Sequence, residues 1–176
     1  MSFDLGNLLQ QYAGNNPAAP DQADQAVNDF DRVAENASSD QLAAGVTQAF
    51  RSDDTPPFPQ MLGSLFGNSN SGQQAGMLNQ LIGGIGPGVL ASLAGGVLGN
   101  MFGGNQQAAP QITPEQASQL SPQQVQDIAK QAEQHNPGIV DRMGAFYAEH
   151  PQLVKGLGGA ALAIALGHMA QGMRRN

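Results

Sequence analysis

The sequence predicts an all-α protein, a multi-helix bundle of about nine short helices. No stretch shows sustained alternation of apolar and polar positions with β-branched residues, which a half-buried strand would require. Proline repeatedly follows a residue that can cap a helix. The N–H at the first helical position has no intrahelical partner, so proline, which lacks this group, loses no hydrogen bond there. This arrangement is therefore typical of helix starts. Together these two patterns favour helices throughout the chain.

In the first part of the chain, we expect helices at residues 2–13, 21–36, 39–51, 57–67, 72–83 and 88–102. The second of these has Phe30 and Val33 on an apolar stripe and acidic residues on its other face, as in an amphipathic surface helix. The fifth begins behind Ser71, with Gln74 at the third helical position of a capping box.

In the second part, we expect helices at residues 114–119, 122–135, 137–149 and 151–172. The first two begin at capping boxes, TPEQ at 113–116 and SPQQ at 121–124, in which a hydroxyl and a glutamine satisfy exposed backbone N–H groups. The other two begin at Pro137 and Pro151, each behind a polar residue.

Composition and charge restrict the classes of function. The net charge is −7, and no charged residue occurs between Asp54 and Glu115. An acidic chain without a basic stripe lacks the lysines and arginines that neutralise phosphates, so we expect no nucleic-acid partner. There is no cysteine, which excludes disulfides and thiolate chemistry. With Asp4 where a signal peptide would be apolar, we expect a cytoplasmic protein.

Small residues at four-residue spacing form a candidate helix-packing seam. On a helix this spacing places them on one face, where two backbones can approach closely. We name these six positions the small-residue seam: Gly95, Gly99, Gly103, Gly159, Ala163 and Gly167. We expect the apolar helices at Val89–Phe102 and Gly156–Gly167 to pack against each other. Both are shorter than the roughly 20 residues of a membrane span, but membrane association stays open as an alternative.

An internal similarity predicts two related halves. SSDQL at 38–42 resembles SPQQV at 121–125, MLGSLF at 61–66 resembles RMGAFY at 142–147, and LNQLIGG at 78–84 resembles LVKGLGG at 153–159. We therefore expect helical halves at 1–104 and 112–176, joined by a linker at 103–111. The alternative is that helices rich in Gly, Ala and Leu align by chance.

No catalytic, cofactor or metal site is predicted. The spacings of His135, His150 and His168 match no metal-ligand pattern. The glycine-rich run at 83–88 lacks the Gly-Lys-Ser/Thr ending of a phosphate loop and no strand precedes it. Asp29 and Asp31 flank Phe30, and this two-residue spacing should place them on different sides of a helix, too far apart to share an acid–base site. We therefore expect the protein not to be an enzyme.

The segments FDLGNLLQQYAG and TPEQASQLSPQQ, with the glycine-rich apolar middle, resemble those of uncharacterised bacterial YidB-like proteins. That resemblance implies a small α-helical domain without an assigned biochemical function. We expect a non-enzymatic bacterial structural or interaction protein that forms a homo-oligomer through its Gly/Ala-lined seam, its other protein partners being unknown. The alternatives are a membrane-associated protein and a small-molecule binder with a cavity between glycine-lined helices.

Overall fold

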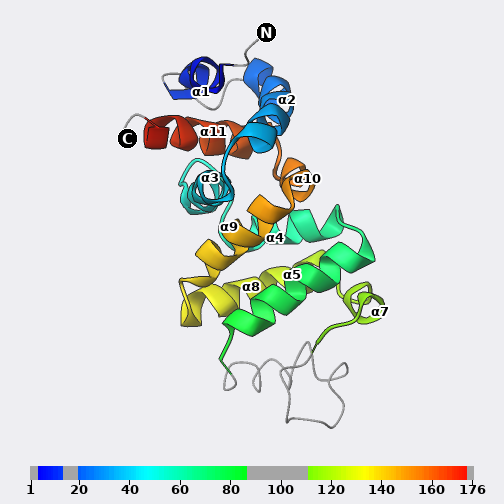
Figure 1. Ribbon diagram of the computed structural model, residues 1–176. Coiled ribbons are helices and arrows are strands. Elements are labelled where there is room, and N and C mark those ends of the chain that lie inside the picture. The colour runs from blue at the N-terminus through cyan, green and yellow to red at the C-terminus, as the bar shows by residue number, and fades with distance from the viewer. Residues whose placement is uncertain (1–3, 14–19, 87–110, 174–176) are drawn as a thin grey trace. The chain divides into compact units, whose positions relative to one another are not determined.

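The computed structural model describes residues 4–13, 20–86 and 111–173, and within these ranges all regular structure is helical (Figure 1). The predicted all-α, multi-helix bundle is therefore confirmed. The described elements are α1 (Leu5–Ala13), α2 (Pro20–Asn36), α3 (Ser39–Arg51), α4 (Phe58–Gly67), α5 (Ser71–Gly84), α7 (Pro114–Ala117), α8 (Pro122–His135), α9 (Ile139–Glu149), α10 (Pro151–Val154), the 3₁₀ turn η1 (Lys155–Leu157) and α11 (Gly159–Met173). The helix expected at 88–102 lies outside the described residues.

Capping boxes begin several of these helices. Thr113 and Ser121 cap α7 and α8 as the sequence predicts, each side chain accepting a hydrogen bond from the N–H of the glutamine three residues later. The box before α5 begins one residue earlier than expected. Asn70 is the cap and Gln73 its reciprocal partner, because asparagine caps as well as serine and has a glutamine at the required spacing.

The single helix expected at 151–172 is broken. The chain forms α10 and η1, then turns at Gly158, whose φ is +83°. This left-handed conformation is one that glycine adopts without steric cost, and it ends the first helix before α11 begins. The GLGG run at 156–159 is thus a helix break.

The described helices form two compact units. Unit 1 contains residues 1–57 and 144–176, and unit 2 contains residues 58–143, so the boundary falls inside α9. These units follow a different division from the two halves expected at 1–104 and 112–176. The linker expected at 103–111 lies outside the described residues except for its last residue, and those halves stay a prediction.

Unit 1 is organised around α11, which lies among α1, α2 and α3 (Figure 1). Leu162, Ala165 and Leu166 of α11 are completely buried, and Ala161 and Ala163 are nearly so. A helix that is apolar on every side is stable in water only when neighbours cover it. The three N-terminal helices supply that cover, and α3 is held close because Gly45 leaves room for Met169.

Unit 2 is organised around the pairing of α4 with α8, with α5 and α7 packed beside it. α8 buries one stripe and exposes the other, as an amphipathic helix does; the buried residues are Val125, Ile128, Ala129 and Ala132. α4 approaches α8 at Gly63, where an added Cβ would lie 2.9 Å from the carbonyl oxygen of Pro122. The close crossing therefore requires glycine at this position.

Candidate functional site

A hollow lies between α1 and α2 of unit 1. Its volume is about 600 Å³, and most of its lining is polar. The lining residues are Leu8 and Gln11 of α1 and Gln25, Asn28, Asp29, Asp31 and Arg32 of α2. The polar side chains face this hollow because the opposite stripe of α2, with Phe30 and Val33, is buried.

Asp29 is the most shielded polar group of this hollow, with its side chain only 17% exposed. Its Oδ2 accepts a hydrogen bond from the hydroxyl of Tyr12 at 2.8 Å, and Arg32 Nη1 lies 3.9 Å from its Oδ1. Burial, together with the hydrogen bond and the charge of Asp29, raises the pKa of Tyr12 well above its usual value. Tyr12 is therefore a neutral hydrogen-bond donor that ties α1 to α2.

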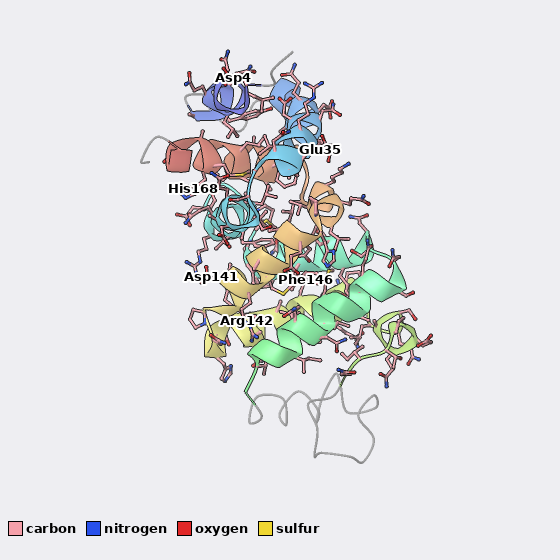
Figure 2. The ribbon with its side chains drawn as sticks, in the orientation of Figure 1. Asp4, Glu35, Asp141, Arg142, Phe146 and His168 are labelled. Atoms are coloured by element: carbon pink, nitrogen blue, oxygen red, sulfur yellow. The ribbon has the colours of Figure 1, made fainter. Side chains whose placement is uncertain are left out.

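A second, smaller hollow of about 310 Å³ shares Asp31 with the first. It is lined by Asp31, Ala34 and Glu35 of α2 and by Pro151, Gln152 and Lys155. Lys155 Nζ lies 2.8 Å from Asp31 Oδ2. Glu35, labelled in Figure 2, comes from the exposed side of α2. The two hollows can offer hydrogen bonds and both signs of charge to a small polar molecule.

The aspartates at positions 29 and 31 have different partners. Asp29 is bound by Tyr12, whereas Asp31 pairs with Lys155. Each carboxylate is thus engaged by a group other than its neighbour. Both line the larger hollow, although the sequence spacing predicts that they face different sides of α2.

The histidines occupy separate structural positions. His135 Nδ1 lies 2.9 Å from the carbonyl oxygen of Gln131, one turn earlier in α8. The ring of His150 packs against Phe146 with a centroid separation of 4.8 Å. His168 lies on α11 and is half-buried (Figure 2). Within the described ranges, no three His, Asp or Glu side chains are grouped so that they could hold a metal ion.

The small-residue seam is described only in its second part. Gly95, Gly99 and Gly103 lie outside the described residues, as does the partner helix expected at 89–102. Of the three positions on α11, Gly159 is half-buried at the helix start and Ala163 is buried. At Gly167, an added Cβ would lie 3.1 Å from the carbonyl oxygen of Tyr12. α1 of the same chain therefore covers this end of the seam.

Two features of the site were not predicted from the sequence. The hollow between α1 and α2 depends on how two helices pack, which the sequence pattern of either helix does not specify. The hydrogen bond from Tyr12 to Asp29 joins residues 17 apart across the connection between those helices. The acidic face of α2 was the one visible indication of this site.

Comparison with known proteins gives no family assignment: no protein-family model, curated protein or solved structure matches the chain.

Proposed function

We propose that the protein is a non-enzymatic structural or interaction protein that associates with further copies of itself. The observation that supports the non-enzymatic part is how five of the described hydroxyl and carboxylate side chains are used. The hydroxyls of Ser38, Thr113 and Ser121 cap helices. The carboxylates of Asp29 and Asp31 join helices of unit 1. These groups stabilise local structure where an enzyme would direct them toward a substrate.

The proposed surface for self-association is the first part of the small-residue seam. The second part is covered on α11, since Ala163 is buried and Gly167 lies against α1. The three glycines at 95, 99 and 103 keep the four-residue spacing that permits close helix contact. Repeated glycines cost a helix about 1 kcal/mol each relative to alanine, so their presence favours a packing role.

Light scattering on the intact chain at tens of micromolar tests self-association. We expect a mass well above the 18.2 kDa of one chain. Gly99→Leu should lower the measured mass because a larger side chain would separate the two backbones. Gly83→Leu is the control, since a Cβ at Gly83 would meet no atom within 4 Å. A monomeric mass for the unmodified chain would refute the proposal.

The membrane alternative is supported by the uncharged stretch between Asp54 and Glu115. Among the described helices, none combines the length and apolar character needed to cross a bilayer. α11, on which the alternative partly rested, is buried against α1, α2 and α3. Flotation with phosphatidylglycerol vesicles distinguishes the two proposals. Recovery of the chain with the vesicles in high salt would favour the membrane alternative, whereas recovery in the lipid-free fraction would exclude it.

The small-molecule alternative is supported by a hollow that differs from the glycine-lined cavity expected from the sequence. The hollow of about 600 Å³ between α1 and α2 is lined by amide and charged side chains. Such a lining suits a small amide or ammonium compound. A thermal-shift screen of such compounds tests it, and Asp29→Asn should abolish any shift that depends on the carboxylate. A screen without any shift would remove this alternative.

A further inference from the structure

In both units, the main helix contacts join a helix from the first part of the chain to a helix from the last part. In unit 1, α11 packs on α1, α2 and α3. In unit 2, α4 and α5 pack on α8, and α5 packs on α7. Each of these pairings joins a helix from residues 4–86, which we name the N-part, to one from residues 111–173, which we name the C-part. Contacts between neighbouring helices of one part, such as α1 with α2 or α4 with α5, are much smaller.

Side chains also bind backbone groups across the two parts. Asn79 of α5 accepts a hydrogen bond from the N–H of Ile112 at 2.7 Å and donates to the carbonyl oxygen of Ile112 at 3.1 Å. In the opposite direction, Asn136 donates to the carbonyl oxygen of Gly84 at 2.9 Å and Arg142 to that of Gly83 at 3.0 Å. These carbonyls end α5 and have no intrahelical partner, so the C-part supplies what the N-part lacks.

The two parts also share one pattern of burial. α3 and α8 each begin with a serine cap and a reciprocal glutamine, at Ser38 and Ser121. Counted from that serine, the same four positions are buried in both helices: Leu42, Gly45, Val46 and Ala49 in α3, and Val125, Ile128, Ala129 and Ala132 in α8. In the helices that follow, α4 and α9, Gly63 and Gly144 occupy matching positions of the sequence similarity, and both are buried.

The partners of these two helix pairs are exchanged. Gly63 of α4 lies against α8, where its added Cβ would be 2.9 Å from the carbonyl oxygen of Pro122. Gly144 of α9 lies against α3, where its added Cβ would be 3.1 Å from the carbonyl oxygen of Ala43. The second helix of each pair therefore contacts the first helix of the other pair, along much of its length for α4 with α8 and at Gly144 and Tyr147 for α9 with α3. The third similarity does not extend this correspondence, because α5 is continuous where residues 153–159 are broken.

We propose that the chain is a duplicated helix pair with exchanged partners, in which the N-part and the C-part are binding partners of each other. Among the described residues, the main cores form between the two parts, since α11 and α8 are covered by helices of the N-part. Short isolated helices are marginal in water, so each part depends on the other to be ordered. The partner that fits the N-part is a C-part, from the same chain or from a second copy. This proposal does not rest on self-association through the small-residue seam.

Cutting the intact chain tests this proposal. A protease site with flanking Gly-Ser residues is inserted between Gly104 and Asn105 of the full chain, which carries an affinity tag at its N-terminus. After cleavage, we expect the untagged C-terminal piece to stay on the affinity resin and the helical circular dichroism to be retained. The melting midpoint of the cut protein should rise with protein concentration, because the folded state then requires association of two molecules.

Two outcomes would overturn the proposal. In the first, the C-terminal piece washes through while both pieces keep their helical signal. In the second, the cut protein melts with midpoints that do not depend on concentration. Either result would mean that the two pieces are independent domains. A monomeric mass for the uncut chain, which would refute self-association, leaves this result unaffected.

A glycine variant tests whether the two pieces associate through the observed crossing of α4 and α8. In the cut protein, Gly63→Ala should weaken association of the two pieces by about tenfold to a hundredfold, since its Cβ would approach the Pro122 carbonyl oxygen closely. Gly83→Ala is the matched control in the same unit, because open space surrounds that position. Equal affinity of the Gly63→Ala and Gly83→Ala proteins would contradict the exchanged pairing.

Discussion

Different interactions stabilise the interior of each of the two compact units. Unit 1 is centred on α11, whose buried face includes Leu162, Leu166 and the alanines between them. Unit 2 pairs amphipathic helices and adds side chains that bind backbone groups, namely Asn79, Asn136 and Arg142. The charged pair at the edge of unit 1, Lys155 with Asp31, is about 40% exposed on both sides and contributes little. Unit 1 therefore depends mainly on apolar burial, with the Tyr12–Asp29 bond in addition, and unit 2 depends more on side-chain hydrogen bonds to the backbone.

This difference follows from the sequences of the central helices. GAALAIALGHMAQGM in α11 has no charged residue and cannot present a solvated face of ordinary character. PQQVQDIAKQAEQH in α8 alternates polar and apolar positions at helical spacing and needs cover on one side only. α11, which needs cover on nearly all sides, therefore packs against three helices, whereas α8 needs cover on one side only.

The largest effect should come from shortening a buried side chain of α11. Leu166 is 0% exposed, so Leu166→Ala should lower the free energy of unfolding by about 2–5 kcal/mol. Ile164→Ala, at a half-buried position of the same helix, should cost clearly less. Chemical denaturation measures both values. Hydrogen exchange should then accelerate mainly in α1, α2, α3 and α11. Equal acceleration in α5 and α8 would contradict the division into two units.

The next effect compares the two glycine crossings in the intact chain. Gly144→Ala should lower the free energy of unfolding by about 1–3 kcal/mol, because its Cβ would collide with the buried Thr47 side chain and approach the Ala43 carbonyl oxygen. Gly63→Ala should lower it by a similar amount, because the flexible, half-buried Gln126 side chain can move aside but the carbonyl oxygen of Pro122, 2.9 Å from the added Cβ, belongs to the backbone. Thermal and chemical denaturation measure both values.

A double variant checks the cause of the Gly144 effect. Thr47→Ala removes the γ atoms that the new Cβ would meet, so Gly144→Ala should be less costly in that background. If the two substitutions are simply additive, the collision with Thr47 is not the source of the destabilisation.

Local features of the fold could be predicted from the sequence because they depend on neighbouring residues. The capping boxes at Thr113 and Ser121 each lie within four residues, and the chemistry of those residues is sufficient to place the helix starts. The cap at Asn70 was displaced by one residue because Ser71 satisfies the same rule. The break before α11 was missed because glycines at 156, 158 and 159 are compatible with both a helix seam and a turn.

The pairing of the helices could not be predicted in this way. An apolar stripe indicates which face of a helix is buried, but it does not indicate which other helix will pack on that face. The similarity of residues 61–66 to 142–147 indicated related glycines, and the structure places Gly63 against α8 and Gly144 against α3. The hollow between α1 and α2 has the same origin, since it depends on the packing of two helices and on the bond from Tyr12 to Asp29.

A smaller effect tests the hydrogen bonds of unit 2. Asn79→Ala should lower the free energy of unfolding by about 1–2 kcal/mol, because both backbone groups of the buried Ile112 lose their partner. Asn68→Ala is the control, since its side chain donates only to the carbonyl oxygen of Ser64 at an exposed position. Exchange should accelerate in α5 and α7. An equal loss for both variants would contradict the role assigned to Asn79.

The smallest effect at neutral pH concerns Tyr12. Tyr12→Phe removes the hydrogen bond to Asp29 and should cost about 1 kcal/mol at pH 7. Both tyrosines of the chain, Tyr12 and Tyr147, lie in unit 1, and burial raises the pKa of each above its usual value. Folding therefore favours the protonated tyrosines. Their contribution is fully present below about pH 10 and is lost as the pH rises further, because the unfolded chain then releases protons that the folded chain retains.

The melting midpoint as a function of pH measures this contribution. Between about pH 9 and pH 11, stability should fall less steeply in Tyr12→Phe than in the unmodified chain, since one of the two linked protons is gone. Tyr147→Phe should flatten the curve separately, and the near-ultraviolet absorbance of each variant should show its remaining tyrosine ionising above the usual range. Curves of equal slope for all three proteins would contradict the shifted pKa values. Because unit 2 has no tyrosine in its sequence, we expect alkaline unfolding to begin in unit 1. A transition that begins in α5 or α8 would contradict this order.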